Sequence, residues 1–293
     1  MRTHSNGRGL PSVSEPASLE EAAAVLTGGR GVSIEREGGD VVLSTRRLAR
    51  VLEYEPGDLT VIVESGMRLS ELRTVLEPHG QMFALDAPGD PTVGACLAGN
   101  LSGPRRHRYG AMRDLVIGVT VVLADGTVAS SGGKVVKNVA GYDLGKLFAG
   151  SRGRLGLVAR VALRLHPRPA AEATAVVETD DPRSYWREVH HSILAPSAVD
   201  FLPPNRFALL FEGSESSVAV QMGHVRGQTP DMAVWDEVAE RQSRATATAG
   251  FDWQDCLLAR PGPGIAYVEA PRPAWSPLAE RVRAVFDPEG VLV

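Results

Sequence analysis

The sequence predicts an α+β protein built in two parts, and three features lead to this prediction. An apolar run at 115–123 and an alternating run at 155–165 are typical of strands. Amphipathic segments that begin with helix-capping residues lie between the strand patterns. The stretch His166-Pro167-Arg168-Pro169 then breaks regular structure, and weaker strand and helix patterns follow it. We therefore predict a disordered N-terminus over 1–15, a larger domain over 16–169 and a smaller α+β domain over 170–293.

The composition is that of an ordinary soluble protein, with 43% hydrophobic and 23% charged residues. A net charge of −4 gives no reason to expect nucleic-acid binding. No stretch reaches the roughly 18 apolar residues of a transmembrane segment, and the polar N-terminus lacks the apolar core of a signal peptide. Cys96 and Cys256 form neither a CxxC pair nor a metal-ligand spacing, which favours a reduced, cytoplasmic setting.

The first predicted helix begins at Ser18, because Ser18 and Glu21 form a capping box before an apolar face, and it ends at Gly28-Gly29. The next residues are predicted to form a hairpin, with strands at 31–37 and 41–44 joined by a Gly-Gly-Asp turn. The other elements of this domain follow from similar signals: a strand at 59–63, a helix at 68–76, a helical turn after Thr92, a hairpin of 115–123 and 127–129, a helix capped by Asp143 and a strand at 155–165.

The smaller domain alternates strand and helix patterns. Its predicted strands lie at 173–177, 197–202, 206–211 and 265–268. Its predicted helices lie at 182–192, 216–225, 231–241 and 276–285.

Residues 91–165 organise the chain, because small residues crowd both ends of this segment. Glycine lets a backbone approach a ligand closely, and consecutive N–H groups in such loops form anion sites. This pattern favours the binding of a dinucleotide across two glycine-rich loops. A tightly packed helix start is the alternative for Pro91 to Gly103.

Four stretches carry a resemblance: Ser102 to Arg106, Arg113 to Gly118, Val136 to Leu144 and Phe286 to Leu292. Together they are similar to the FAD-linked oxidases of the vanillyl-alcohol oxidase type, whose flavin domain is called PCMH-type. Within that family they most resemble the GlcE-type subunits of bacterial glycolate oxidase. The resemblance covers the part of the chain before the proline-rich stretch well and the C-terminal stretch moderately.

The resemblance implies a fold and a cofactor. Residues 16–169 would form a two-subdomain PCMH-type FAD-binding domain with a shortened first subdomain, and 170–293 would form a smaller α+β cap domain with a C-terminal helix. FAD would be bound non-covalently, since no His or Cys occupies a recognisable attachment position. The positions that match FAD-lining residues of the family are Pro91, Thr92, Val93, Gly94, Gly99, Asn100, Ser102, Gly103, Gly110, Arg113, Asp114 and Val158.

The resemblance also implies a role in oxidising a 2-hydroxy acid. Subunits of this type work beside a catalytic flavoprotein subunit and an iron–sulfur subunit, in the cytoplasm or peripheral to the inner face of the membrane through these partners. Catalytic relatives carry a His-Gly-x-Gly-type metal and base cluster in the second domain, and this sequence has nothing similar. No catalytic residue and no metal site is therefore predicted, and an accessory role is favoured. A self-sufficient FAD-dependent 2-hydroxy acid dehydrogenase and a flavin-free structural subunit are the alternatives.

One stretch departs from the family. Its members carry a longer segment before residue 41, with a Pro-Arg-Gly-Gly-Gly-Thr-type loop that cradles the FAD pyrophosphate. Here only Gly28-Gly29-Arg30-Gly31 is present. These residues could instead form the turn that ends the preceding helix. Loss of the loop would thin one wall of the phosphate site, so we expect weak FAD binding.

Three further groups of polar residues leave alternatives open. The basic run Arg105-Arg106-His107-Arg108 could meet a phosphate, a substrate carboxylate or an acidic partner, or form a solvated loop. Arg113 and Asp114 fit a structural ion pair as well as a cofactor contact. A loop cluster could face a flavin ring or bond its own backbone; its members are Lys134, Lys137, Asn138, Tyr142 and Asp143. The neighbouring His190 and His191 would point to different faces of a helix and so do not form a metal pair.

Overall fold

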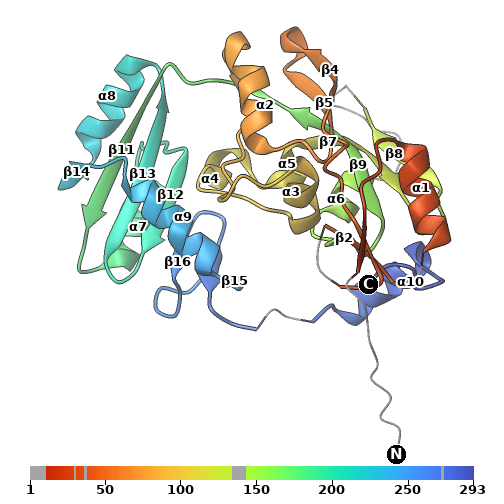
Figure 1. Ribbon diagram of the computed structural model, residues 1–293. Coiled ribbons are helices and arrows are strands. Elements are labelled where there is room, and N and C mark those ends of the chain that lie inside the picture. The colour runs from red at the N-terminus through yellow and green to blue at the C-terminus, as the bar shows by residue number, and fades with distance from the viewer. Residues whose placement is uncertain (1–10, 30, 36–37, 134–142, 272–273) are drawn as a thin grey trace, which may run out of the picture.

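The α+β prediction is confirmed by a computed structural model, which describes residues 11–29, 31–35, 38–133, 143–271 and 274–293. Two bodies lie side by side in Figure 1. One contains a five-stranded and a three-stranded sheet, and the other contains a seven-stranded sheet. The strands of the five-stranded sheet precede residue 169 and those of the seven-stranded sheet follow it.

The five-stranded sheet is antiparallel and has the order β4-β5-β9-β7-β8. Its strands are β4 (Val51–Glu55), β5 (Thr60–Glu64), β7 (Val116–Val122), β8 (Val128–Gly132) and β9 (Leu157–Arg164). Helices α2 (Leu69–Leu76), α3 (Val93–Gly99), α5 (Met112–Leu115) and α6 (Leu144–Phe148) contribute buried residues to the same hydrophobic core. The strands predicted at 115–123 and 155–165 thus become the neighbours β7 and β9.

Helix α1 (Leu19–Gly28) begins where the capping pattern predicts. The Ser18 hydroxyl accepts a hydrogen bond from the Glu21 N–H at 3.2 Å, and the Glu21 carboxylate accepts one from the Ala17 N–H at 2.8 Å. Such reciprocal bonds satisfy N–H groups that the first helical turn leaves unpaired. A short 3-10 helix (Pro56–Asp58) precedes β5, and another (Glu77–His79) follows α2.

In the N-terminal part the predicted hairpin is wrong, and the structure differs from the predicted disorder at Ser12–Ser14. Strands β2 (Val32–Ile34) and β3 (Val41–Leu43) pair in parallel and do not form a hairpin, because Glu35 and Gly38-Gly39 take positive φ and return the chain to its starting side. Asp40 N–H then bonds to Gly31 O at 2.7 Å. Within the region predicted to be disordered, β1 (Ser12–Ser14) pairs with β3; a three-residue edge strand held by a distant partner leaves no local signal.

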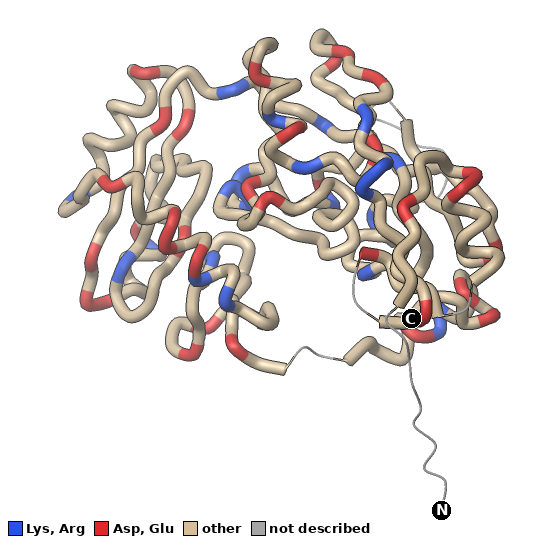
Figure 2. Tube along the Cα trace, in the orientation of Figure 1, with Lys and Arg blue, Asp and Glu red and all other residues tan. Residues whose placement is uncertain are grey.

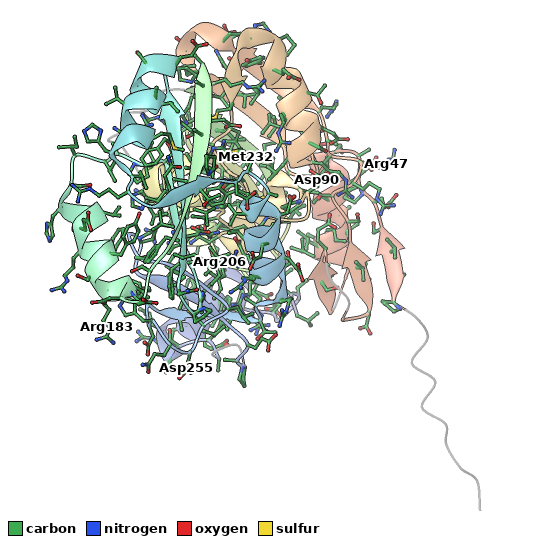
Figure 3. All side chains as sticks on the ribbon, turned by 90° about the vertical axis from the view of Figure 1, so that its left-hand side faces the viewer. Arg47, Asp90, Arg183, Arg206, Met232 and Asp255 are labelled. Carbon is green, nitrogen blue, oxygen red and sulfur yellow. The ribbon has the colours of Figure 1, made fainter. Side chains whose placement is uncertain are left out.

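The seven-stranded sheet has the order β14-β11-β13-β12-β16-β17-β15 and forms the core of the second body. Its strands are β11 (Ala171–Glu178), β12 (Ala198–Leu202), β13 (Arg206–Gly213), β14 (Gln228–Pro230), β15 (Ala247–Gly250), β16 (Leu258–Arg260) and β17 (Ile265–Val268). Helices α7 (Pro182–His191), α8 (Glu215–His224) and α9 (Val234–Arg244) flank it. This body, which we call the cap, faces the viewer in Figure 3, where Arg206 and Met232 are labelled on it.

The end of the chain returns to the first body. Helix α10 (Pro277–Phe286) places Phe286 edge-on to Phe148, with ring centroids 5.9 Å apart. Leu292 is fully buried and bridges in parallel to Val32. A two-stranded pairing of β6 (Gln81–Met82) with β10 (His166–Pro167) lies where the chain leaves the first body.

Acidic and basic residues alternate over the trace of both bodies in Figure 2, without a domain of one sign. None of the helices in the described ranges is long and apolar enough to cross a membrane.

Candidate functional site

A cavity of about 220 Å³ lies between α3 and the loop before β9 in the first body. Three elements surround it: the start and end of α3, the turn after β5, and the segment 151–158. The end of β2 and Thr45 close the remaining side. The lining residues are Ile34, Glu35, Thr45, Ser65, Gly94, Ala95, Ala98, Gly99, Ser151, Arg152, Gly153, Gly156, Leu157 and Val158.

The close contact of α3 with the turn after β5 depends on Gly94. Its N–H donates to the Ser65 carbonyl oxygen at 2.7 Å. A Cβ at residue 94 would lie 2.8 Å from the Ser65 Cβ, closer than real side chains approach. Thr92 caps α3, because its hydroxyl accepts from the Ala95 N–H at 3.1 Å. The start of α3 therefore presents only small side chains to the cavity.

Two buried hydroxyls of the cavity have no hydrogen-bond partner within the described ranges. Ser65 is fully buried and Ser151 is 4% exposed, and both Oγ atoms are unpaired. A buried hydroxyl without a partner loses the hydrogen bonds that it makes in water. Both residues line the cavity, so a polar ligand there would offer these hydroxyls the partners that the protein lacks.

A carboxylate closes one side of the same cavity. The Glu35 Oε1 atom accepts hydrogen bonds from both the backbone N–H and the hydroxyl of Thr45, the latter at 2.6 Å. Thr45 is 3% exposed. The side chain of Arg152 also lines the cavity, so charges of both signs are present there.

The structure brings three of the twelve residues that were predicted to bind FAD to this cavity, namely Gly94, Gly99 and Val158. Thr92 and Val93 lie at the start of α3, where Val93 is fully buried in the core. The carbonyl oxygen of Pro91 accepts a hydrogen bond from the Leu69 N–H at 3.1 Å. These positions hold α3 in place.

The other six residues do not line the cavity and make contacts elsewhere. Asn100 ends α3 with φ +46, and its side-chain oxygen accepts from the Arg113 N–H at 3.2 Å. Arg113 and Asp114 form the structural ion pair, 4.0 Å apart. Gly103 packs so tightly that a Cβ would lie 2.0 Å from the Asp86 carboxylate. Ser102 is buried, and Gly110 takes φ +87 next to Asp114.

The basic run meets acidic residues of its own chain. Arg105, just before α4 (Arg106–Tyr109), bonds Glu212 of β13 at 2.8 Å and Glu172 of β11 at 3.2 Å. Its guanidinium also lies 3.6 Å from Asp86. Burial raises the pKa of Asp86, although the charges of Arg105 and Arg260 oppose the shift. Arg105 thus pairs with three carboxylates from both bodies.

A buried chain of hydrogen bonds runs from the cap to Ser102. Arg260, fully buried, pairs with Asp200 at 3.1 Å and contacts Tyr267 OH. Burial raises the pKa of Asp200, with Arg260 opposing the shift. Gln242 accepts from Arg260 at 2.6 Å and donates to the Ser102 carbonyl oxygen at 2.7 Å.

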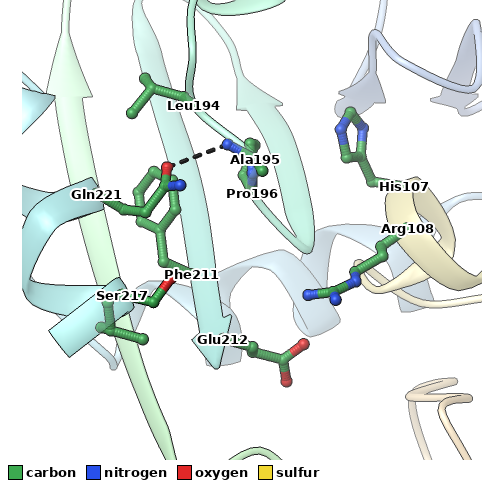
Figure 4. Close-up of a pocket in the computed structure, with 10 residues that line it drawn as sticks. His107, Arg108, Leu194, Ala195, Pro196, Phe211, Glu212, Ser217 and Gln221 are labelled. Carbon is green, nitrogen blue, oxygen red and sulfur yellow. Dashed lines mark hydrogen bonds between the residues drawn. The ribbon is translucent and has the colours of Figure 1, made fainter. Parts of the chain in front are cut away.

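A second cavity, of about 410 Å³, lies between α4 and the cap (Figure 4). The Arg108 side chain extends toward it, and its Nη1 atom donates to Ser197 Oγ at 3.2 Å. No carboxylate in the described ranges lies within ion-pair distance of Arg108. Gln221 and Ser217 of α8 line the opposite wall.

The part of the chain that the structure describes holds no group of three His, Cys, Asp or Glu residues able to bind a metal ion. His190 and His191 contact each other with ring centroids 5.1 Å apart. Four members of the predicted loop cluster, Lys134, Lys137, Asn138 and Tyr142, lie outside the described residues. The fifth, Asp143, caps α6 by accepting from the Lys146 N–H at 3.1 Å.

Ser65 and Thr45 reach the cavity from outside the glycine-rich segment and were not predicted from the sequence. Ser65 and Thr45 follow strands about thirty and fifty residues before Gly94, and their types are common in loops. The one feature of the local sequence that could have pointed to Ser65 is the Ser65-Gly66 pair directly after the strand Thr60–Glu64. Gly153 and Gly156 belonged to the segment singled out by its small residues.

Comparisons with known proteins match parts of this chain. Residues 17–132 match the family described as "FAD binding domain". The Escherichia coli "Glycolate oxidase subunit GlcE" is 30% identical over 212 residues, which cover 71% of this chain and 60% of that protein. The yeast "D-lactate dehydrogenase [cytochrome] 1, mitochondrial" of Saccharomyces cerevisiae is 34% identical over 170 residues, covering 57% of this chain and 29% of that protein.

A solved structure supports the fold. An alkyldihydroxyacetonephosphate synthase superposes with a TM-score of 0.63 at 18% identity, covering 78% of this chain and 55% of that one. The chain spans less than two thirds of the length of these relatives.

Proposed function

We propose, from the premise that residues 17–132 belong to the family of PCMH-type FAD-binding domains, that this chain is the FAD-binding, accessory subunit of a glycolate oxidase-type complex. The substrate class is a 2-hydroxy acid. The proposed partners are a catalytic flavoprotein subunit and an iron–sulfur subunit, which would place the chain in the cytoplasm or at the inner face of the membrane. FAD binding rests on the cavity between α3 and residues 151–158.

The chemistry of the cavity fits FAD in one respect and opposes it in another. The unpaired hydroxyls of Ser65 and Ser151 would donate to polar groups of the cofactor. Gly94 and Gly99 would let the cofactor approach the α3 backbone. The Glu35 carboxylate on the remaining side opposes negative charge. When bound, FAD would supply the two-electron acceptor.

The accessory role rests on what oxidation of a 2-hydroxy acid requires. A base must lie near the hydroxyl, and a cation must meet the carboxylate. Arg105 is already paired with three carboxylates. The described residues contain no metal-binding cluster that could supply the base arrangement of catalytic relatives.

Dye reduction tests this proposal. The chain alone, reconstituted with FAD, should show little glycolate or lactate oxidation, and turnover should appear when both partner subunits are co-expressed. Comparable turnover by the lone chain and the assembled complex would contradict the accessory role.

A self-sufficient dehydrogenase is the second candidate, favoured by the D-lactate dehydrogenase relative and by Arg108. Arg108 lies at a cavity of sufficient size for a small acid and has no carboxylate partner in the described ranges. If the lone chain oxidises lactate, Arg108→Ala should raise KM strongly. Arg168→Ala, which removes an exposed arginine paired with Glu77, is the matched control. A flavin-free structural subunit is the remaining alternative, and purified protein without a flavin absorbance spectrum after FAD addition would favour it.

A further inference from the structure

Glu35 takes a backbone conformation that is uncommon for its residue type. It ends β2 and begins the short connection to β3, with φ +54. This left-handed region is sparsely occupied by residues other than glycine, asparagine and aspartate. The two hydrogen bonds from Thr45 to the Glu35 carboxylate keep the side chain at the cavity.

Thr45 offers the kind of donors that bind anions in proteins. A backbone N–H and a hydroxyl converge on one carboxylate oxygen, and hydrogen bonds to an ionised acceptor are stronger than neutral ones. The residue that supplies these donors is almost fully buried. A free anion in the cavity would find the Thr45 donors occupied and would meet the negative charge of Glu35.

We propose that the carboxylate of Glu35, an exposed residue that lines the cavity, competes as an anion with the pyrophosphate of FAD for the Thr45 donors and lowers the affinity of the cavity for FAD. This inference rests on the proposed function, because it takes FAD as the ligand of the cavity. Glu35 is then a determinant of cofactor affinity, and it acts on the phosphate-bearing part of the ligand.

Titration calorimetry with FAD and with riboflavin, which has no phosphate, tests the proposal on the full chain. Glu35→Ala should lower the Kd for FAD by about tenfold, the effect of one charge-assisted hydrogen bond, and should leave the Kd for riboflavin within about twofold of the parent. Thr45→Val combined with Glu35→Ala should reduce the gain, since the freed hydroxyl donor is removed. Glu188→Gln, at an exposed position on α7, makes the same change of charge far from the cavity and should change neither Kd.

Glu35→Gln is a second variant in case Glu35→Ala does not fold. Thermal melting checks that each variant is folded. The amide can still accept from the Thr45 N–H without a negative charge, so this variant should gain FAD affinity, although less than Glu35→Ala. Measurable FAD binding by the parent that neither Glu35 variant improves would overturn this inference alone. Equal gains for FAD and riboflavin would also overturn it, because they indicate a general opening of the cavity. If no variant binds FAD, both this inference and the proposed FAD binding fail.

Discussion

Gln242 of α9 donates a hydrogen bond from Nε2 to the backbone carbonyl oxygen of Ser102, 2.7 Å away. The same amide accepts from the buried guanidinium of Arg260 at 2.6 Å. One side chain thus connects the core of the cap to the segment that leaves α3. The position of the cap against the first body depends on this amide and on the carboxylates around Arg105.

Gln242→Ala should destabilise the protein by about 1–3 kcal/mol, because the Ser102 carbonyl oxygen loses the Gln242 donor and Arg260 Nη2 keeps only its bond to Asp200. Urea unfolding measures the loss. Gln254→Ala, at an exposed position whose side chain makes no hydrogen bond within the described ranges, should stay within about 0.5 kcal/mol of the parent. Equal losses in both variants would show that Gln242 has no special role.

Acid precipitation should release all bound flavin into the supernatant. Burial raises the pKa of the Cys96 thiol to about 12, so this cysteine carries no thiolate at neutral pH that could attach to a flavin. Burial also raises the pKa of Cys256. Flavin that stays with the pellet, measured by its absorbance, would contradict a non-covalent site.

The isolated chain should bind FAD weakly or purify partly without it. Only Gly28-Gly29-Arg30-Gly31 is present where the resemblance implies a longer phosphate-binding loop. Each missing charge-assisted hydrogen bond costs about 1.5–3 kcal/mol, which is roughly a tenfold or larger change in Kd. Fluorescence titration that gives a nanomolar Kd for the lone chain would refute the importance of this loop.

Glu64→Gln should lower the melting temperature at pH 7, and the deficit should shrink in acid. The Glu64 carboxylate accepts from Arg50 N–H at 2.9 Å and from its guanidinium at 2.8 Å. Burial alone would raise the pKa of Glu64, but the contacts with Arg50 outweigh it and lower the pKa. The stabilisation is therefore complete above the ordinary carboxyl pKa and is lost as pH falls through the lowered one. Melting curves from pH 7 to about pH 3 test this, and a deficit that does not depend on pH would contradict it.

The sequence predicted elements well where local signals define them. The caps predicted at Ser18 and Asp143 are confirmed, and so is the helix predicted at 276–285. The direction of β2 against β3 was missed, because a Gly-Gly-Asp turn does not reveal that Glu35 also takes positive φ. The short strands β14, β15 and β16 were missed because their partners, not their own residues, define them.

For the candidate site, the glycines of α3 were predictable because their local density is unusual. Ser65, Thr45 and Glu35 were not, since they reach the cavity from other elements through tertiary packing. The partners of Arg105 were equally hidden, because Glu172 and Glu212 lie more than sixty residues away along the chain.

The return of α10 and Leu292 to the first body means that the cap is attached at both of its ends. Its first strand follows β10, which is paired with β6, and its last strand leads to α10, which packs against Phe148. A module joined by one linker can swing freely, whereas two fixed attachments restrict its motion to rocking about the line that joins them. Any opening between the bodies would therefore be a small rotation about that axis. Such a rotation would have to break the ion pairs of Arg105 with Glu172 and Glu212.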